Sequence, residues 1–380
     1  MAVIDAFASP TAAKDLSTYS AAHGLPTPKL TERVAPGIYN HPTTRKWDPS
    51  GWAGEEQLDL EAVHTMAPGA NIVYVGAPNS GQSLDAALNE VVDKHLADIV
   101  TNSYGWAGET LPGGYIKPQV DIQIQAAAEG ISVFYSSGDA GDETNGVTGV
   151  TPSPDFSASS PWVTAVGGTS MGVSQSNTRL FEVGWETGRS TLDPKTGQWT
   201  VPAYQYGAGG GTSKLFPQPA YQKGVVSAIS TTQRVVPDVA ALADPSTGMA
   251  VGQTQTFSDG VKYDEFRIGG TSLASPLYAG MFALAVQRHG AYGLANPTLY
   301  ATRTVSYDVT KAPLAQYPGV VRADYVNGEN ASDGTTFSAR WFDYDSVLTI
   351  HVRTGYDDVT GVGTPNGRAW LNAVAPSSSH

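Results

Sequence analysis

Residues 268–280 read IGGTSLASPLYAG, and they join a short strand (EFRI, 265–268) to an amphipathic helix. Two glycines form the turn, and Pro276 falls in the first turn of the helix, where proline is tolerated. The hydroxyl of Ser272 is therefore expected at a helix N-terminus. There the helix dipole and the Ser272 N–H face any negative charge that develops on a bound carbonyl. A serine at this position is more commonly an ordinary N-cap, so that alternative stays open.

Outward from this turn, short apolar runs alternate with amphipathic segments. The predicted strands are 3–7, 71–77, 97–104, 131–136 and 162–168, and the predicted helices are 11–22, 55–66, 82–96 and 118–129. This alternation predicts an α/β fold with a mainly parallel sheet and helices on both faces. Ligands of such sheets bind at the carboxyl ends of the strands.

Two stretches break the alternation. Residues 185–220 are rich in Gly, Thr, Tyr and Pro and are expected to form long surface loops. Residues 305–366 are polar and are expected to form loops and short strands, as one small metal-stabilised lobe. No repeat or long linker divides the chain, so we expect one domain over 1–380.

Composition excludes several classes of protein. The chain has 380 residues, 41% of them hydrophobic, a formal net charge of −13 and no cysteine. Disulfides, thiolate metal sites and cysteine nucleophiles are excluded. The acidic balance argues against a nucleic-acid partner, and no apolar stretch is long enough for a membrane span.

A serine nucleophile needs a base, and the acidic helix around residues 55–66 offers one. Glu55 and Asp59 are four residues apart and share a helix face, so their ionisation is coupled and one pKa is raised. Such a pair can accept the Ser272 proton. The alternative is a solvated acidic face that includes Glu56 and Glu61. None of the seven histidines lies in a catalytic motif, and His64 on this helix is expected to be packed or on the surface.

A third segment, ISVFYSSGDAGD at 131–142, places Asp139 just after a buried strand. A protonated carboxyl group there can donate a hydrogen bond to an oxyanion. An Asp in a turn that accepts bonds from its own backbone is the alternative, and Asp142 is the competing candidate.

Together these segments resemble the sedolisins, the serine-carboxyl peptidases of subtilisin-like fold. The likeness rests on Gly-Thr-Ser-x-x-x-Pro at 270–276 and on Glu-x-x-x-Asp before Ala-Pro-Gly-Ala at 67–70, and it runs from VIDAF (3–7) to GVGTPN (361–366). The resemblance implies an acid-active serine endopeptidase that cleaves proteins, with Ser272 as nucleophile. It also implies that Glu55 is the base, Asp59 its partner and Asp139 the oxyanion donor, with Ala140 in place of the usual Ser.

The resemblance implies further positions around this centre. Asp5 and Tyr104 extend the carboxylate network, although Asp5 also occupies the place of the catalytic Asp in subtilisins, which would have no active role here. The strand ends Ser103, Tyr104, Gly105 and Ser136, Ser137, Gly138 are expected to pair with an extended substrate.

The resemblance also implies one calcium ion near the C-terminus. Its ligands would be Asp308, Val309, Arg353, Gly355 and Asp357, with Arg353 where Gly is usual and acting through its backbone carbonyl. Oxygen ligands of this kind suit Ca²⁺. Two Asp-capped turns are the alternative.

The family further implies a secreted monomer that acts on protein or peptide substrates. Its own N-terminal prodomain would aid folding and inhibit the enzyme, and the prodomain and first mature residues would precede this chain. A catalytically inactive homologue that only binds its partners is the second candidate function. A formal glycosylation sequon stands at 330–332.

Overall fold

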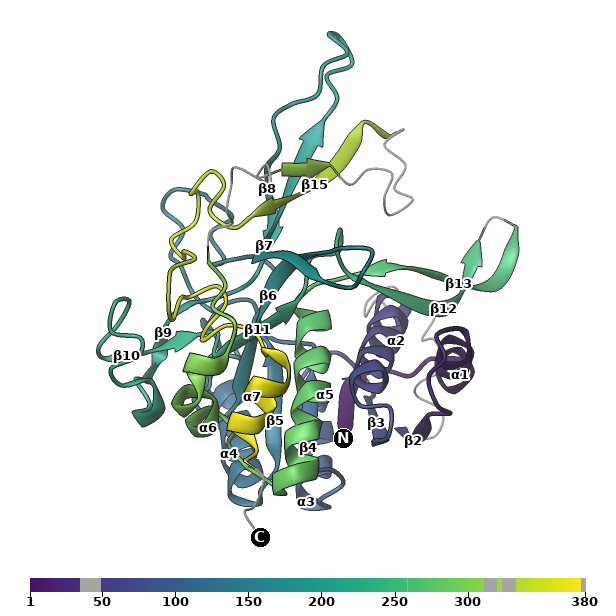
Figure 1. The fold of residues 1–380 in the computed structure, drawn as a ribbon, viewed down its shortest axis with the longest axis vertical. Coiled ribbons are helices and arrows are strands. Elements are labelled where there is room, and N and C mark those ends of the chain that lie inside the picture. The colour runs from purple at the N-terminus through teal and green to yellow at the C-terminus, as the bar shows by residue number, and fades with distance from the viewer. Residues whose placement is uncertain (35–48, 258, 311–319, 323–332, 377–380) are drawn as a thin grey trace.

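The computed structural model describes residues 1–34, 49–257, 259–310, 320–322 and 333–376. At its centre lies a parallel sheet (Figure 1). Its strands, in spatial order, are β2 (Lys29–Val34), β3 (Asn71–Ala77), β1 (Ala2–Ala6), β4 (Ile99–Asn102), β5 (Ser132–Ser136), β6 (Thr164–Val173) and β11 (Val239–Leu242). Strands β1, β4 and β5 are buried along their whole length, as in a sheet covered on both faces.

Helices cover both faces of this sheet, as the sequence predicts. Helices α3 (Ser83–Asp93) and α4 (Gly113–Ala128) pack on one face with β1 and β5. Helices α2 (Pro49–Met66) and α5 (Thr271–His289) pack together on the other face. Helix α1 (Ala12–Ala22) lies beside α2.

The ends of several elements differ from the predicted ones. Helix α2 begins at residue 49 instead of 55, and α4 begins at 113 instead of 118, so that Pro118 lies inside it. Strand β4 is shorter than the predicted 97–104. Pro276 likewise lies inside α5, past its first turn.

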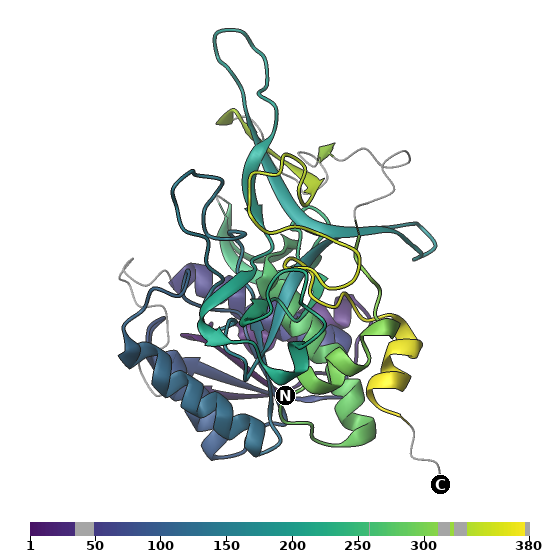
Figure 2. The ribbon, with the colours of Figure 1, turned by 90° about the vertical axis from the view of Figure 1, so that its left-hand side faces the viewer.

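The prediction of loops over 185–220 is wrong. Strands β7 (Arg179–Thr191), β8 (Ala203–Gly207) and β9 (Gly211–Pro217) occupy much of it. Strand β7 runs antiparallel to β6 and pairs antiparallel with β15 (Thr335–Trp341), so the sheet is parallel only in its central part. With β8 and β14 (Val320–Arg322), these strands form an arm that projects from the body (Figures 1 and 2).

The expected separate lobe over 305–366 is also not seen among the described residues. Leu348, Ile350, Val352 and Val359 belong to the same hydrophobic core as α5, and β15 belongs to the arm. The sequon at 330–332 lies outside the described residues.

The remaining elements surround this frame. A hairpin of β12 (Met249–Phe257) and β13 (Gly260–Ile268) leads directly into α5 and packs on α1 and α2. The others are η2 (Ala220–Gln222), β10 (Gln233–Val236), α6 (Asn296–Ala301), η3 (Arg303–Val305) and α7 (Gly367–Val374). Among the described residues, no helix is both long and apolar enough to cross a membrane.

Candidate active site

The turn between β13 and α5 fixes the position of Ser272. Gly270 is the N-cap of α5 with a φ of 91°, so the N-cap residue has no side chain to bond the helix start. A Cβ on Gly269 would lie 2.2 Å from the carbonyl oxygen of Ala243, so glycine is required there. Ser272 is the second residue of the helix and is half-buried. The ordinary N-cap alternative is therefore wrong.

Glu55 on α2 lies against this serine. The Ser272 hydroxyl lies close enough to the Glu55 carboxyl group to affect its ionisation. Burial raises the pKa of Glu55 to about 7; the nearby Ser272 hydroxyl lowers it in part, and the charge of Asp139 adds to the rise. The carboxyl group is thus placed to take the serine proton at a pH where part of it is ionised.

Asp59 lies one turn further along α2 and is fully buried. Burial, followed by the charges of Asp5 and Glu55, raises the pKa of Asp59 well above its usual range. Asp5 on β1 is also fully buried, and neither of its carboxyl oxygens has a hydrogen-bond partner among the described residues. Burial and then the charge of Glu55 raise the pKa of Asp5 as well. The structure thus gathers three mutually interacting carboxyl groups behind Ser272, as the resemblance implied.

The helix face around this pair is not solvated. Glu56 is buried and accepts a hydrogen bond from the Ser9 N–H at 2.5 Å, and Glu61 is buried and accepts one from the Gly252 N–H at 2.9 Å. The solvated acidic face is therefore wrong. His64 is also buried, and its Nε2 lies 2.9 Å from the Pro26 carbonyl oxygen.

Ser103 was expected only to pair with substrate. In the structure it connects Asp59 on α2 with Ser272 on α5. Its hydroxyl lies 2.8 Å from Asp59 Oδ1 and 3.0 Å from the Ser272 carbonyl oxygen. Tyr104 does not join the carboxylates in this way, because its hydroxyl donates to Asn102 Oδ1 at 2.9 Å and its ring packs edge-on against Tyr135. No signal in the sequence distinguishes Ser103 from Tyr104 as the contact, because that depends on which side of β4 faces α2.

Asp139 approaches the nucleophile turn from the end of β5. Its Oδ1 accepts hydrogen bonds from the Thr271 N–H at 2.7 Å and from the Thr271 hydroxyl at 2.8 Å. Its Oδ2 would lie 2.7 Å from a Cβ on Gly270, beside Ser272. Although Asp139 as a residue is exposed, the protein packed around its carboxyl group raises its pKa, against the effect of the Thr271 bonds.

The competing candidate, Asp142, has a structural position. It accepts hydrogen bonds from the backbone and hydroxyl groups of Thr144 and Thr349. Burial alone would raise the pKa of Asp142, but these bonds hold it below the usual range. A carboxyl group that stays ionised cannot donate to an oxyanion.

Two further acids that the sequence analysis did not single out lie beside Asp139. Asp155 accepts the Gly108 N–H at 2.9 Å and shares a hydrogen bond with Glu143. Burial, then the charge of Glu143, raises the pKa of Asp155; burial raises that of Glu143. A Cβ on Gly138 would lie 2.3 Å from Asp155 Oδ2, which keeps this position glycine.

The two segments predicted to pair with substrate differ in how many backbone groups they leave free for a substrate. Gly105 is exposed at the end of β4, next to a bridge between Trp106 and Phe156. Gly138 instead donates its N–H to the Thr271 hydroxyl at 3.0 Å and accepts from Gly209 N–H at 2.7 Å.

Other groups of that second segment are used within the fold as well. Ser136 is paired within the sheet, and Ser137 donates its N–H to Val166 and its hydroxyl to Gly209. The Ser137 N–H and both backbone groups of Gly138 are therefore used within the fold, while substrate pairing through the carbonyl groups of Ser136 and Ser137 stays a prediction.

The predicted calcium residues come together on two loops. The Gly355 N–H donates to Asp308 Oδ2 at 2.9 Å, and Asp357 is buried and accepts the Val359 and Thr360 N–H groups. Burial raises the pKa of Asp357 to about 8, and the hydrogen bonds from the backbone of Thr360, Val359 and Arg353 lower it in part. Among the described residues, no group of three or more His, Asp or Glu side chains could hold a metal. Two carboxylates plus the carbonyl groups of Val309, Arg353 and Gly355 remain a donor set that fits Ca²⁺, while the bonds to Asp357 also match an Asp-capped turn.

Comparisons with known proteins show which families and folds the chain resembles. Residues 35–319 match the family described as the Subtilase family. The chain is 32% identical over 96% of its length to kumamolisin of Bacillus sp. (strain MN-32) and 28% identical over 90% to sedolisin of Pseudomonas sp. (strain 101). It is also 30% identical over 85% to tripeptidyl-peptidase 1 of Canis lupus familiaris.

These alignments cover 58%, 55% and 52% of those proteins, so the chain spans about half the length of the curated relatives that it matches. Among solved structures, it is similar to Pseudomonas sedolisin, a serine-carboxyl proteinase, in complex with pseudo-iodotyrostatin. The TM-score is 0.70 at 26% identity, and the match covers 96% of this chain and 88% of that one.

Proposed function

This chain belongs to the subtilase family, with the subtilisin-like fold of its sedolisin relatives, and from that premise we propose that it is an acid-active serine-carboxyl endopeptidase. The observation that carries the proposal is the position of the Ser272 hydroxyl beside the buried Glu55 carboxyl group, with Asp139 beside the same serine. No histidine is needed, because a carboxylate holds the place of the base.

In the first step Glu55 takes the proton of the Ser272 hydroxyl, and the oxygen forms a bond to the scissile carbonyl carbon. The carbonyl oxygen becomes an oxyanion. The protonated Oδ2 of Asp139 and the Ser272 N–H at the start of α5 donate hydrogen bonds to it. Thr271 holds the other oxygen of Asp139, which fixes the direction of the proton.

In the second step the tetrahedral intermediate collapses and the C–N bond breaks, while Glu55 returns its proton to the leaving amine. Water then attacks the acyl-enzyme and gives its proton to Glu55, and Ser272 leaves with that proton. Asp59 and Asp5 stay close to Glu55 throughout. The charge of Glu55 raises the pKa values of both, so these two acids keep their protons while Glu55 is ionised.

The two catalytic acids impose opposite requirements on pH. Glu55 must be ionised and Asp139 must be protonated, so the active fraction is largest midway between their pKa values. The pKa of Glu55 is raised to about 7, and that of Asp139 is raised above its usual value of 3.8. As long as the pKa of Asp139 stays below that of Glu55, the maximum lies on the acid side of neutrality.

We propose that the substrates are proteins or peptides, bound in extended form along Ser103, Tyr104 and Gly105. The enzyme is proposed to be a secreted monomer whose own prodomain assists folding and inhibits it. One calcium ion is proposed to bind Asp308 and Asp357 with the carbonyl groups of Val309, Arg353 and Gly355. That ion would join the two loops and take no part in proton transfer.

The test is a pH–rate profile, from about pH 2 to 8, for cleavage of an unfolded protein by the enzyme matured from its full precursor. We expect a bell-shaped curve with an acid maximum, and no activity in Ser272→Ala at any pH. Mass spectrometry of the products separates internal cleavage from the successive release of tripeptides.

Other outcomes would contradict the proposal in different ways. A neutral or alkaline maximum would contradict the roles of Glu55 as the base and Asp139 as the oxyanion donor. No cleavage by a folded, mature enzyme would favour the inactive binding homologue.

A further inference from the structure

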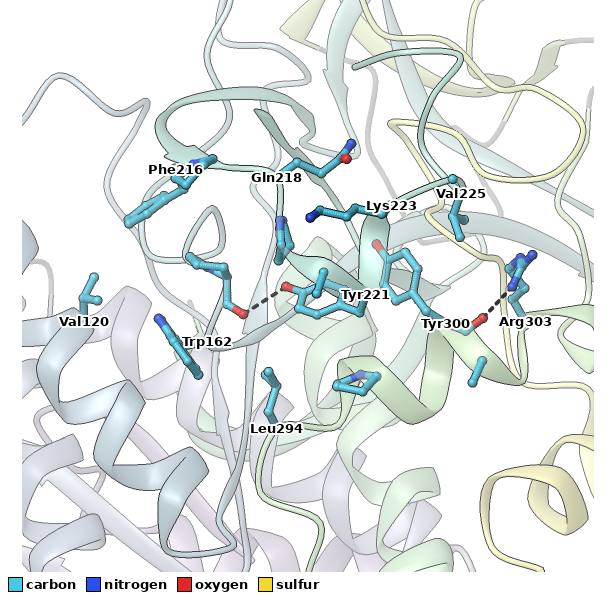
Figure 3. Close-up of a pocket in the computed structure, with 17 residues that line it drawn as sticks. Val120, Trp162, Phe216, Gln218, Tyr221, Lys223, Val225, Leu294, Tyr300 and Arg303 are labelled. Carbon is cyan, nitrogen blue, oxygen red and sulfur yellow. Dashed lines mark hydrogen bonds between the residues drawn. The ribbon is translucent and has the colours of Figure 1, made fainter. Parts of the chain in front are cut away.

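A cavity lies away from the catalytic residues, between α4, α6 and the segment that follows β9. Its volume is about 1060 Å³, and none of the residues proposed for catalysis lines it. Figure 3 shows the residues around it. Val120, Trp162, Phe216 and Leu294 line one end, and the rings of Tyr221 and Tyr300 form the wall beside them. The cavity is therefore mainly apolar and rich in aromatic rings, as small-molecule sites are.

Hydrogen bonds on the side away from the cavity hold Tyr221 and Tyr300 in place. Tyr221 donates its hydroxyl to the Pro161 carbonyl at 2.9 Å, and Tyr300 donates its hydroxyl to Asp238 Oδ1 at 2.9 Å. Asp238 is in turn paired with Arg234, and both are fully buried. Because these hydroxyls are used inside the protein, the two tyrosines present ring faces to the cavity, and the cavity exists before any ligand binds.

The charges around the cavity are unusual for this protein. The chain carries 35 acidic and 22 basic residues, yet the cavity lining contains no Asp or Glu and two cations, Lys223 and Arg303. In Figure 3, Lys223 lies above Tyr221 in the view, and Arg303 lies on the far side of Tyr300. The Lys223 ammonium has no hydrogen-bond or ion-pair partner among the described residues. Arg303 already donates to the Tyr300 carbonyl at 3.0 Å.

From this arrangement we propose that the cavity binds an amphipathic monocarboxylate, with its apolar body against Trp162, Leu294 and Val120 and its carboxylate on Lys223. One ammonium group beside aromatic rings suits a single negative charge. A phosphate group would need a convergent set of donors, and the rings of Tyr221 and Tyr300 separate Lys223 from Arg303. The apolar area supplies the affinity, and the ammonium selects the anion over a neutral molecule of the same length.

The test uses octanoate and octan-1-ol as probes, because they differ only in the charged end. Binding to the mature protein is measured by calorimetry at pH 7, where the carboxylate is ionised. We expect octanoate to bind with a dissociation constant on the order of 0.1–1 mM and octan-1-ol to bind more weakly. Trp162 is 38% exposed, so its fluorescence should change on binding, and Trp162→Phe should remove that change.

Three variants assign the binding to this cavity. Lys223→Met keeps the length of the side chain without its charge and should weaken octanoate about 5- to 10-fold, with no effect on octan-1-ol. Arg303→Met is the matched control, and it should leave octanoate binding within about two-fold. Leu294→Trp fills the apolar end and should abolish the binding of both probes.

The proposal does not depend on peptidase activity, because every readout is binding. It is overturned if octanoate does not bind, if octan-1-ol binds as tightly, or if Lys223→Met binds octanoate as the parent does. It is also overturned if sedimentation shows a dimer that Leu294→Trp dissociates, since the cavity face would then be an interface between two copies.

Discussion

At the scale of single residues, the hydroxyl of Ser103 connects the base pair to the nucleophile segment. Its one proton can be given to Asp59 Oδ1 at 2.8 Å or to the Ser272 carbonyl oxygen at 3.0 Å. Donation to Asp59 favours the ionised form of that acid and partly offsets its raised pKa. Ser103 therefore positions the pair and tunes its ionisation without touching the substrate carbonyl.

We expect Ser103→Ala to lower kcat by about 2- to 10-fold, the range for losing a hydrogen bond between neutral groups. The pKa of the carboxyl cluster should rise, so the acid limb of the profile should move to higher pH. The measurement is kcat against pH. Ser159→Ala is the control, because Ser159 is also buried but its hydroxyl has no hydrogen-bond partner in the described part of the chain. An unchanged acid limb in Ser103→Ala would contradict this assignment.

Asp139 allows a second test at this scale. Asn at this position can accept the Thr271 bonds through its oxygen and donate through its amide at every pH. Asp139→Asn should therefore retain activity within about ten-fold of the parent and shift the alkaline limb upward, whereas Asp139→Ala should lose about 10²- to 10³-fold. An alkaline limb that stays in place in Asp139→Asn would show that another group sets it.

At the scale of elements, buried acids on helices α1 and α2 join these helices to the β12–β13 hairpin. Glu61 accepts the Gly252 N–H at 2.9 Å, and Asp15 on α1 accepts the Thr254 N–H at 2.7 Å. Burial raises the pKa of Glu61 to about 9; the Gly252 bond lowers it in part, and the charges of Glu265 and Asp15 raise it. The hairpin leads into the nucleophile turn, so these contacts also support the position of Ser272.

This raised pKa gives stability a definite pH dependence. Between its unfolded pKa of 4.5 and its folded pKa of about 9, Glu61 binds more protons in the folded state than in the unfolded one. The free energy of unfolding therefore falls as pH rises through this window. Its contribution is complete only below about pH 4.5.

We expect Glu61→Gln, which keeps the acceptor for Gly252, to flatten this dependence. The variant should gain about 1–3 kcal/mol of stability at pH 8 relative to pH 5, compared with the parent. The measurement is urea unfolding at the two pH values. Glu129→Gln on the surface of the protein is the control. Parallel pH dependences in Glu61→Gln and the parent would mean that Glu61 is not protonated in the fold.

At the scale of the whole molecule, two loops far apart in the chain meet beside the core. Asp308 follows η3, and Asp357 lies near the C-terminus, with the Gly355 N–H joining them. Tyr307 and Thr364 form a bridge next to this contact. If a cation binds there, it stabilises the folded state only, because the unfolded chain separates its ligands.

We expect calcium at about 100 times its dissociation constant to raise the unfolding temperature by about 3–4 °C. Asp308→Asn should lose this increase, and Asp193→Asn, at an exposed turn, should keep it. The measurement is calorimetric unfolding with calcium and with a chelator. An equal response in Asp308→Asn would place the ion elsewhere, and no response in the parent would favour the Asp-capped turn.

Much of the chain could be interpreted from local patterns alone. The alternation of buried strands with amphipathic helices predicted the parallel sheet and its two layers of helices, since each element carries its own periodicity. The spacing of Glu55 and Asp59 placed them on one helix face, and the Gly-Gly-Thr-Ser run placed Ser272 at a helix start. These features depend on residues within one or two turns of each other.

Tertiary structure alone decided the rest. It brought Asp5 and Ser103 to the carboxyl pair, turned Tyr104 away from it, buried Glu56 and Glu61, and used the backbone of Gly138 within the fold. The arm of β7 and β15 also joins segments that neither read as strands nor lie near each other in the chain. Strand pairing and burial are set by partners distant in sequence, and a carboxyl group's pKa follows that burial, so neither can be obtained from local pattern.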